Sequence, residues 1–257
     1  MNMNIIQLEE LISNSQNIVC INGRGMTYDC GYPEYWTQNY SYYFENKYGK
    51  SMEEIYNIGF YSTRSKEFFE IYKEEILKFK FKPSLSYYKL AQLEKIGRLK
   101  CCITKGIFNL AQRAGCKNVI DIYGNVYDNI CPKCGQRYSV DYMIQSKGLP
   151  KCLECNSAIR PDVKMIGELI DNNKVTKAMN AISTADMLLI LDTGYNGEFK
   201  EYLSHYYGNK AVLIKDTYHE SDKLANYIIY DKSKNVLTKL SDEKVHIIYD
   251  KLEVVNH

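Results

Sequence analysis

The sequence predicts an α/β protein in which a parallel sheet, with helices on its faces, is interrupted by a small zinc-binding insertion. Short runs of apolar, β-branched residues alternate along the chain with helical patterns, which is typical of a parallel sheet. The first such run leads directly into Gly23-Arg24-Gly25, a glycine turn of the kind that follows a buried strand. A stretch rich in Pro, Gly and Cys at residues 131–155 interrupts the alternation and carries the spacing of a metal site.

The chain begins with a helix and a strand. Residues 5–16 carry apolar side chains at helical spacing and end in polar residues that favour a turn, which predicts a helix. Residues 17–21 form a short run rich in β-branched side chains, which predicts a buried strand that enters the glycine turn.

A long helical region follows, from about residue 40 to residue 98. Pro83, directly before Ser84, marks a break in this region and the start of a new helix. The candidate helices are residues 51–62, 65–79 and 84–99.

The alternation of strands and helices resumes after this region. Residues 99–104 predict a strand, residues 112–115 end a turn of helix, and residues 117–123 predict another strand. Beyond the insertion the expected elements are a helix, a strand, a helix, two strands and a closing helix, at residues 175–185, 186–193, 199–207, 210–216, 225–231 and 235–252.

This order predicts two structural units. With 257 residues the chain can form one large domain or two small ones. We expect residues 1–125 and 160–257 to form the sheet domain and residues 126–159 to form the zinc-binding insertion. Some of the helices within residues 37–82 are expected to pack with the smaller unit.

Composition and charge exclude several classes of protein. The chain is 45% hydrophobic and 25% charged, which is ordinary for a soluble globular protein. Its 33 basic and 31 acidic residues give a formal charge of +2, so the overall electrostatics favour neither nucleic acid nor an anionic membrane. The longest apolar stretches, residues 187–191 and 211–214, are far shorter than the roughly 20 residues that cross a bilayer. Residues 1–10 lack the pattern of a secretory signal, and we expect a cytoplasmic protein.

The cysteine spacing is the strongest functional signal in the sequence. Two C-x2-C pairs, separated by 17 residues, place two sulfurs on each of two tight turns, as in tetrahedral zinc sites. The four ligands are Cys131, Cys134, Cys152 and Cys155. Because four protein ligands leave no open coordination position, we expect a structural Zn2+. The alternative is four free cysteines in a loop, and the other five cysteines fall where cysteine usually acts as a small buried hydrophobe.

The glycine turn is a candidate phosphate site. Glycines after a strand let the backbone approach a diphosphate closely, with amide groups aimed at the anion. A bare G-x-G also occurs in ordinary tight turns, and the full G-x-G-x-x-G fingerprint is absent because position 28 is Tyr28. Arg24 could reach a phosphate or point into solvent, and the sequence leaves both interpretations open.

Taken together, these motifs resemble the sirtuins, a family of NAD-dependent protein deacylases and ADP-ribosyltransferases. Residues 23–27 and 31–36 are similar to the Gly-Ala-Gly-Ile-Ser and Gly-Ile-Pro-Asp-Phe-Arg segments of that family. Residues 104–115 match Thr-Gln-Asn-Ile-Asp-Gly-Leu-His-x-x-Ala-Gly at both ends, and residues 118–124 are similar to the strand before the family's catalytic His-Gly. The cysteines follow in the family's order. Pro83 and residues 90–94 are similar to the family's Pro-Asn-x-x-His-x-x-Leu-Ala-x-Leu-Glu helix, and residues 160–163 and 167–168 resemble its Arg-Pro-x-Val-Val-x-Phe-Gly-Glu segment. Asp192-Thr193-Gly194 stands where the family has Gly-Thr-Ser.

The resemblance implies a Rossmann-like parallel sheet domain with a small inserted zinc domain, and a nucleotide ligand that is NAD or ADP-ribose. The residues that it assigns to the cofactor are Gly23, Arg24, Gly25, Tyr35 and Thr193. A protein substrate or partner is also expected, whereas a membrane or nucleic acid partner is not.

The sequence departs from the family at the residues that perform the chemistry. Tyr123 stands where the family has its general-base histidine, and all four histidines of this chain lie beyond the insertion. The other replaced positions are Gly106 and Phe108 for Asn and Asp, Lys105 for Gln, Trp36 for Arg, and Lys164 and Ile166 for apolar residues. Because tyrosine has a pKa of about 10, it is poorly matched to a base that works near neutral pH. Ordinary deacylation is therefore not expected.

Three hypotheses about function remain open. The chain could be a divergent enzyme of this class that cleaves NAD with a rearranged set of residues, in which Tyr123 is the candidate catalytic residue. The other candidates, each of which also has a purely structural interpretation, are Lys105, Asp29, Glu34 and Arg24. The chain could instead be a catalytically silent module that senses a nucleotide or serves as a protein scaffold. The third hypothesis makes the tyrosine-rich span 28–61 a stacking surface for nucleobases, but no basic stripe accompanies that span.

Overall fold

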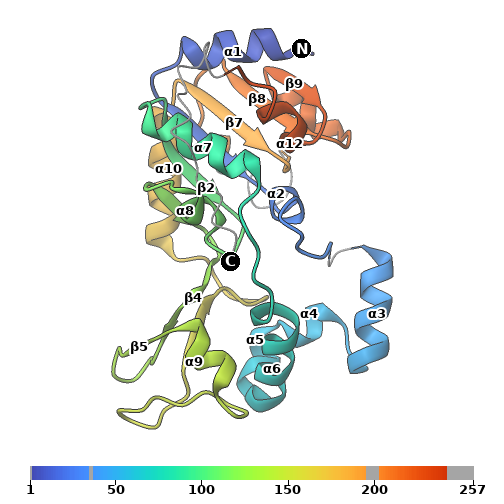
Figure 1. Ribbon diagram of the computed structural model, residues 1–257, viewed down its shortest axis with the longest axis vertical. Coiled ribbons are helices and arrows are strands. Elements are labelled where there is room, and N and C mark those ends of the chain that lie inside the picture. Colours follow the sequence, from blue (N-terminus) through green and yellow to red (C-terminus); the bar gives the residue numbers. More distant parts are fainter. Residues whose placement is uncertain (1, 35–36, 195–202, 242–257) are drawn as a thin grey trace, which may run out of the picture.

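Two blocks of structure are stacked along the long axis of the molecule, a sheet with flanking helices and a smaller block of helices and short strands (Figure 1). This computed structural model describes residues 2–34, 37–194 and 203–241. Within these ranges, none of the helices combines the length and the apolar character needed to cross a membrane.

The larger block is built on a six-stranded parallel sheet in the order β3-β2-β1-β7-β8-β9. Its strands are β1 (Ile18–Asn22), β2 (Leu99–Thr104), β3 (Val119–Asp121), β7 (Met187–Leu191), β8 (Ala211–Lys215) and β9 (Tyr227–Tyr230). Every residue of β1, β7 and β8 is buried, because helices cover both faces of the sheet. The predicted α/β fold with a parallel sheet is therefore confirmed.

Helices from different parts of the chain cover the two faces. One face is covered by α1 (Ile5–Ser13), α7 (Leu85–Lys95), α8 (Leu110–Ala114) and α12 (Ser233–Leu237), and the other by α10 (Asn172–Thr184). The helix α1 begins with a capping box in which the Asn4 side chain accepts a hydrogen bond from the Gln7 amide at 3.0 Å. Its Leu8 and Ile12, one turn apart, are fully buried against the sheet.

The direction in which the chain adds strands reverses at β1. The chain first places β2 and β3 on one side of β1, and then returns to place β7, β8 and β9 on the other side. In sheets of this kind a crevice opens beyond the carboxyl ends of the strands at the point of reversal. The glycine turn follows β1 directly, so it lies at this point.

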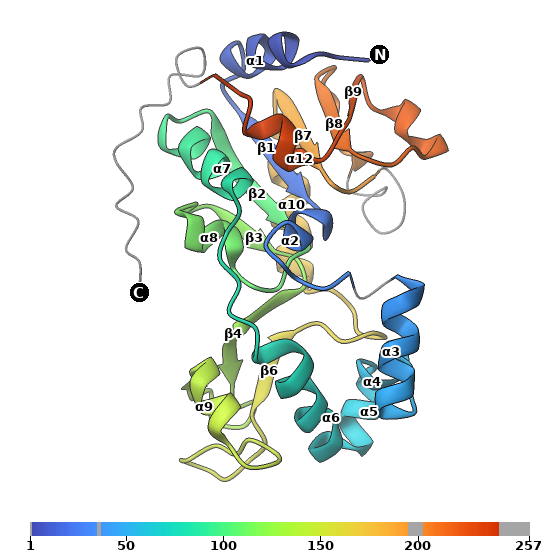
Figure 2. The ribbon, with the colours of Figure 1, turned by 45° about the vertical axis from the view of Figure 1, so that its right-hand side comes forward.

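The smaller block combines helices that follow α2 (Gly25–Tyr28) with the insertion. Its helices are α3 (Gln38–Tyr48), α4 (Met52–Ile55), α5 (Ile58–Thr63), α6 (Ser65–Tyr72), the π-helix η1 (Lys73–Leu77) and α9 (Val140–Gln145). Its antiparallel sheet, in the order β5-β4-β6, is formed by β4 (Gly124–Ile130), β5 (Arg137–Tyr138) and β6 (Arg160–Val163). The Lys73 ammonium donates hydrogen bonds to the carbonyls of Ser146 and Gly148, which connects η1 to the insertion. Figure 2 shows α2 at the boundary between the two blocks.

Several helices differ from the sequence prediction. The helix expected at residues 51–62 is two helices, because the Asn57 side chain accepts a hydrogen bond from the Gly59 amide at 2.8 Å and caps a new start. The closing helix expected at residues 235–252 is wrong in its described part, since α12 begins at Ser233 and ends at Leu237. The rest of that prediction, and residues 199–202 of the helix expected at 199–207, lie outside the described residues. The sequence pattern also gave no indication of α2, β4, β5, β6, α9 and the short 3-10 helix η2 (Glu220–Leu224).

Candidate functional site

The glycine turn after β1 is shaped by its contact with the end of β7. The Gly23 amide donates a hydrogen bond to the Leu191 carbonyl at 2.8 Å, so the sheet already uses this amide. A Cβ added to Gly23 would lie 2.2 Å from the Asp192 carbonyl oxygen, and one added to Gly25 would lie 2.5 Å from the Asp192 Cβ. Both positions require glycine because the adjoining chain leaves no room for a side chain. The cofactor roles of Gly23 and Gly25 stay predictions. For Gly23 the prediction rests on its lack of a side chain, because its amide is already bonded to the Leu191 carbonyl.

The next residues form the short helix α2. Arg24 immediately precedes α2 in a helical conformation, and its exposed side chain lines the central cavity described below. The predicted cofactor residue Tyr35, together with Trp36, lies outside the described residues. Of the cofactor residues predicted in this part of the chain, the structure therefore describes Gly23, Arg24 and Gly25.

The end of β7 carries an unusual acidic residue. Asp192 adopts the left-handed backbone conformation with a φ of 46°, which favours glycine, asparagine or aspartate. Burial raises the pKa of its carboxyl to about 6, although the Ser233 amide, which donates a hydrogen bond at 3.2 Å, opposes the shift. The negative charges of Asp29 and Asp216 raise this pKa further. The strand end beside the glycine turn therefore carries a carboxyl group whose pKa is raised to about 6.

Thr193 links this strand end to the neighbouring loop. Its hydroxyl oxygen accepts a hydrogen bond from the Lys105 ammonium at 3.4 Å. Lys105 follows β2, and its own amide donates to the Asn22 carbonyl at the end of β1. The loops after β2 and β7 thus meet beside the glycine turn, which itself follows β1. The cofactor role expected for Thr193 stays a prediction.

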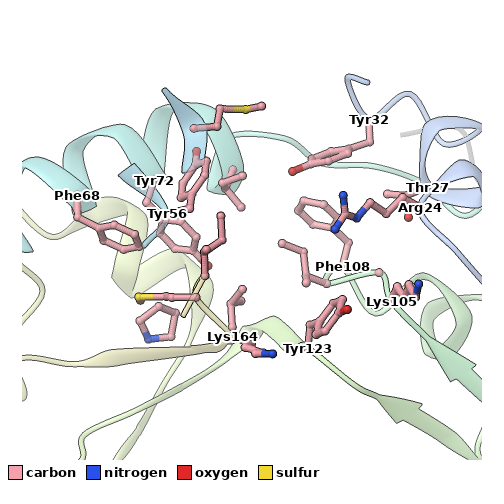
Figure 3. A pocket seen from close by; sticks show the side chains of 18 of the residues that line it. Arg24, Thr27, Tyr32, Tyr56, Phe68, Tyr72, Lys105, Phe108, Tyr123 and Lys164 are labelled. Atoms are coloured by element: carbon pink, nitrogen blue, oxygen red, sulfur yellow. The ribbon is translucent and has the colours of Figure 1, made fainter. Parts of the chain in front are cut away.

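A cavity of about 330 Å3 extends from these loops toward the smaller block (Figure 3). One wall carries Arg24, Tyr32, Lys105 and Phe108, and the opposite wall carries rings from the smaller block, including Tyr56 and Tyr72. The described lining is mostly apolar and includes three basic side chains but no carboxylate. The lining residues are Arg24, Thr27, Tyr28, Tyr32, Met52, Tyr56, Phe68, Tyr72, Ile76, Lys105, Gly106, Ile107, Phe108, Tyr123, Pro161, Val163, Lys164, Met165, Ile166 and Gly167.

Phe108 closes one side of this cavity as part of an aromatic cluster. Its side chain is 2% exposed, and its ring centroid lies 4.7 Å from that of Tyr32 and 5.1 Å from that of Phe81. Edge and tilted ring contacts of this kind add to the free energy gained by burial alone. Phe108 is therefore part of the core and leaves an apolar surface at this position.

Tyr123 lies on the floor of the cavity, between β3 and β4. The next residue, Gly124, has a φ of 71°, and a Cβ there would lie 1.6 Å from the Asp162 carbonyl oxygen. This contact with β6 fixes the chain beside Tyr123. The Tyr123 carbonyl accepts a hydrogen bond from the Lys164 amide at 2.9 Å, and the Lys164 ammonium lies 5.6 Å from the centroid of the Tyr123 ring.

The structure brings together some of the candidate catalytic residues and separates others. Tyr123, Lys105 and Arg24 line the same cavity, but neither Asp29 nor Glu34 lines it. Asp29 directly follows α2 and lies near Asp192. Burial raises the pKa of the Asp29 carboxyl. Of the histidines within the described residues, His219 caps η2 through the Ser221 amide, and none lines the cavity.

The four cysteines of the insertion converge on one point. Their sulfur atoms lie within 4.8 Å of one another, with 3.5 Å between Cys131 and Cys155 and 3.4 Å between Cys134 and Cys152. These separations are too long for disulfides, whose sulfurs lie about 2.05 Å apart. They are close to the separation of about 3.8 Å between ligands of a tetrahedral zinc ion with Zn–S bonds of about 2.3 Å. The cluster therefore fits the structural zinc predicted from the spacing.

Local turns prepare the two cysteine pairs in the same way. The Gly135 amide donates to the Cys131 carbonyl, and the Asn156 amide donates to the Cys152 carbonyl, each at 2.9 Å. Both donors have a positive φ, which glycine and asparagine tolerate. Burial alone would raise the pKa of the Cys152 thiol, but hydrogen bonds from the Tyr138 hydroxyl and neighbouring amides lower it to about 6. The surroundings of Cys152 thus favour the thiolate form of this cysteine, which is the form that binds metal.

Other lining residues carried no functional signal in the sequence. Tyr56, Phe68 and Tyr72 lie within helical patterns and are expected there as core residues. Among the described residues of the tyrosine-rich span, most rings pack at least partly against the core, whereas Tyr42 and Tyr43 are exposed on α3. The half-buried Asp192 also lacks a signal in the sequence, because its environment depends on strands that are distant in the chain.

Comparisons with known proteins agree with this architecture. The family model described as the Sir2 family matches residues 23–196. An NAD-dependent protein deacetylase of Clostridium perfringens is 34% identical over 240 residues, covering 93% of this chain and 98% of the relative. A protein of the same name from Thermotoga maritima is 31% identical over 219 residues, covering 82% of this chain and 87% of the relative.

Solved structures show the same likeness. A sirtuin structure concerned with substrate affinity superposes with a TM-score of 0.82 at 26% identity, covering 94% of this chain and 99% of that chain. A structure of Sir2 bound to acetylated peptide has a TM-score of 0.80 at 25% identity, covering 96% of this chain and 100% of that chain. A structure of Sir2 with a p53 peptide and NAD+ has a TM-score of 0.79 at 25% identity, covering 94% and 98%.

Proposed function

This chain belongs to the Sir2 family, and on that premise we propose that it binds NAD or ADP-ribose at the reversal point of its sheet without carrying out ordinary deacylation. The observation that carries this proposal is the junction of the glycine turn with Asp192 and Thr193, beside a cavity of about 330 Å3. A volume of this order is typical of small-molecule sites.

Binding is supported by the position of the crevice. Nucleotides bind parallel α/β sheets outside the carboxyl ends of the strands at the point where the strand order reverses. Gly23 and Gly25 keep the turn free of side chains there, and the hydroxyl of Thr193 is held at the same edge by Lys105. Relatives of the chain are named NAD-dependent protein deacetylases, and one similar structure contains NAD+.

The loss of ordinary deacylation is supported by the chemistry of the lining. A general acid or base works best when its pKa lies near the operating pH. The titratable side chains of the described lining are tyrosines, lysines and an arginine, whose ordinary pKa values are about 10 or higher. Tyr123 takes the place of the expected histidine, and Phe108 presents an apolar ring where the family has a carboxylate.

One observation favours a second candidate function, cleavage of NAD by a rearranged set of residues. Tyr123, Lys105 and Arg24 line one cavity although they are far apart in the sequence. A tyrosine hydroxyl beside a lysine is a plausible pair for proton transfer only if one of the two pKa values is shifted strongly toward neutrality. This hypothesis predicts that turnover depends on the Tyr123 hydroxyl.

The surroundings of the cavity support the expectation of a protein substrate or partner. A second recess of about 470 Å3 adjoins it and shares Tyr123, Pro161, Val163 and Lys164 with its lining. This recess is polar, with the Arg160–Glu168 ion pair at 2.6 Å on its wall. A similar structure contains an acetylated peptide. We infer that a protein segment would approach along this recess.

The test combines binding with turnover. Calorimetry of the purified, zinc-loaded protein with NAD+ and with ADP-ribose should show binding of at least one of them. In parallel, NAD+ should be incubated with the protein, with and without an acetylated peptide, and released nicotinamide measured. We expect no release above background, and no change in Tyr123→Phe. Release that disappears in Tyr123→Phe would establish the second candidate, and the absence of any nucleotide binding would refute the first.

A further inference from the structure

The carboxyl group of Asp192 lies against the glycine turn. Its Cγ atom is 3.1 Å, and its Cβ atom 2.5 Å, from the place that a Cβ on Gly25 would take. One carboxyl oxygen accepts a hydrogen bond from the Ser233 amide at 3.2 Å, so the side chain is held between the turn and the start of α12. The proposed function places the diphosphate of the nucleotide at this strand end. A bound diphosphate would therefore meet the Asp192 carboxyl at close range.

Charged groups of both signs surround Asp192. Burial is the largest cause of its raised pKa of about 6, and the carboxylates of Asp29, after α2, and Asp216, after β8, raise it further. The basic side chains of the adjoining loops are Arg24 in the turn, Lys105 beside Thr193, Lys215 at the end of β8, and Lys232 and Lys234 at the start of α12. The raised pKa is the net result of these surroundings. The basic groups therefore do not cancel the cost of a negative charge on Asp192.

Several of the basic groups act on other carboxylates at this edge of the sheet. The Lys215 ammonium pairs with the buried Asp222 carboxylate at 3.1 Å. Lys232 and Lys234 act on Asp29, whose pKa they lower against the larger effect of burial. The positive charge of this edge is thus shared among several acidic groups.

A diphosphate would add to the cost of ionising Asp192. Its two negative charges do not titrate near neutral pH, and like charges repel one another more strongly where the effective dielectric constant is low. The protonated carboxyl of Asp192 escapes this repulsion. It can still accept from the Ser233 amide through one oxygen, while its hydroxyl can donate a hydrogen bond to a phosphate oxygen. A nucleotide at the turn therefore favours the protonated form.

Proton binding and nucleotide binding are then linked thermodynamically. A group that binds a proton more tightly in the complex than in the free protein takes up protons when the ligand binds. The pKa of Asp192 is about 6 in the free protein and would be higher in the complex. Nucleotide binding should therefore be strongest below about pH 6 and should weaken as the pH rises from there to the pKa of the complex.

We propose that Asp192 controls the nucleotide site by its protonation: the nucleotide binds together with a proton that the Asp192 carboxyl takes from the solvent, and the ionised carboxylate opposes the diphosphate. This inference rests on the proposed function, since it takes the diphosphate to lie at the glycine turn. It deepens that function by naming the condition that regulates binding.

Calorimetry at several pH values measures this linkage. The zinc-loaded protein is titrated with ADP-ribose at pH 6, 7 and 8.5, and its zinc content is checked at each pH. At pH 7 the titration is repeated in two buffers with different heats of ionisation, because the difference between the measured enthalpies gives the number of protons taken up. We expect roughly half a proton or more per nucleotide at pH 7, and a dissociation constant about tenfold higher at pH 8.5 than at pH 6.

Variants assign the proton to Asp192. Asp192→Asn has the shape of the protonated acid, tolerates the φ of 46° and cannot ionise, so we expect tight binding at every pH and almost no proton uptake. Asp192→Gly, which removes the side chain, should also lose the pH dependence. Glu220→Gln is the matched control, because it removes an exposed carboxylate that pairs with Lys223, and it should keep the wild-type proton uptake.

The outcomes distinguish this inference from the function on which it rests. Binding without proton uptake would overturn the inference and leave the proposed function intact. Histidines also titrate in this range, so proton uptake that persists in Asp192→Asn would come from another group and would overturn it as well. If neither ADP-ribose nor NAD+ binds to the wild type or to Asp192→Asn at any of these pH values, although circular dichroism shows both proteins folded, the proposed function itself fails.

Discussion

Asp192 lies directly against Gly25, so closely that a Cβ on Gly25 would come within 2.5 Å of the Asp192 Cβ. This contact joins the first turn of the sheet to the end of the strand beside it, although the two residues are far apart in sequence. When its motifs are aligned with those of the Sir2 family, the family has glycine at the positions of both Gly25 and Asp192. This chain keeps the first glycine and has an aspartate at the second position. The junction is therefore both tightly packed and acidic.

Gly25→Ala tests the packing of this junction. The added methyl group must displace Asp192, so we expect a loss of roughly 1–3 kcal/mol in unfolding free energy and weaker nucleotide binding. Urea unfolding and calorimetry provide the measurements. Gly59→Ala is the matched control, because its Cβ would meet only the Asn57 side chain and it lies in a helix, where alanine is favoured. Equal stability of Gly25→Ala and wild type would contradict the contact.

Asp192→Asn tests the acidic character of the junction. Burial, with Asp29 and Asp216 nearby, raises the pKa of Asp192 from 3.8 to about 6. Because this pKa is raised in the folded state, the associated stability is complete below about pH 4 and is lost as the pH rises through 6. Asparagine also tolerates the φ of 46°. We therefore expect Asp192→Asn to be more stable than wild type by roughly 1–3 kcal/mol at pH 8, with a gain less than half as large at pH 4.5.

The measurement for this variant is urea unfolding at both pH values. A gain of the same size at pH 4.5 and pH 8 would show that the effect does not come from ionisation of the carboxyl group.

Removal of zinc tests the cysteine cluster. Elemental analysis should find one zinc ion per chain, and a strong chelator should lower the melting temperature, because the free energy of metal binding supports the fold of the insertion. Cys134→Ser and Cys152→Ser should lose the metal. Cys30→Ser, at a half-buried cysteine outside the cluster, should retain it. Metal-free protein with an unchanged melting temperature would count against a structural zinc.

A polar network in the smaller block provides a fourth prediction. The Glu75 carboxylate is 1% exposed and accepts hydrogen bonds from the Lys47 ammonium at 2.8 Å, the Tyr48 hydroxyl at 2.5 Å and the Tyr40 hydroxyl at 2.8 Å. Burial would raise the pKa of Glu75, but these hydrogen bonds lower it overall. Since the folded-state pKa is lowered, this stability is present above the ordinary pKa of 4.5 and is lost as the pH falls below it.

We expect Glu75→Gln to lower the unfolding free energy by roughly 1–3 kcal/mol at pH 7, because the Lys47 ammonium and two tyrosine hydroxyls lose a buried charged acceptor, while Lys47 keeps its ion pair with Glu74 at 2.6 Å. Glu67→Gln is the control, since the Lys50–Glu67 pair is 3.6 Å apart and more exposed, and it should cost less than about 1 kcal/mol. Thermal and urea unfolding of both variants, at pH 7 and pH 4, would measure the difference. Equal losses in the two variants would mean that the network adds no more than a surface ion pair.

Local chemistry was enough to predict much of this molecule. Alternating strand and helix patterns predicted the parallel sheet, because buried strands and half-buried helices each require a characteristic spacing of apolar side chains. The C-x2-C pairs predicted the thiolate cluster, because each pair lies on one tight turn. The order of motifs predicted the Sir2 family. Helix boundaries were less certain where side-chain caps decided them, as Asn57 does between α4 and α5.

Tertiary structure alone decided the character of the cavity. Arg24, Lys105 and Lys164 line one space only because the loops after β1, β2 and β6 meet there, and no local pattern encodes that meeting. The same holds for Asp192, whose pKa depends on burial and on charges from the loops after α2 and β8. Burial periodicity is a property of neighbouring residues, whereas electrostatic potential sums over groups that the fold brings together through space.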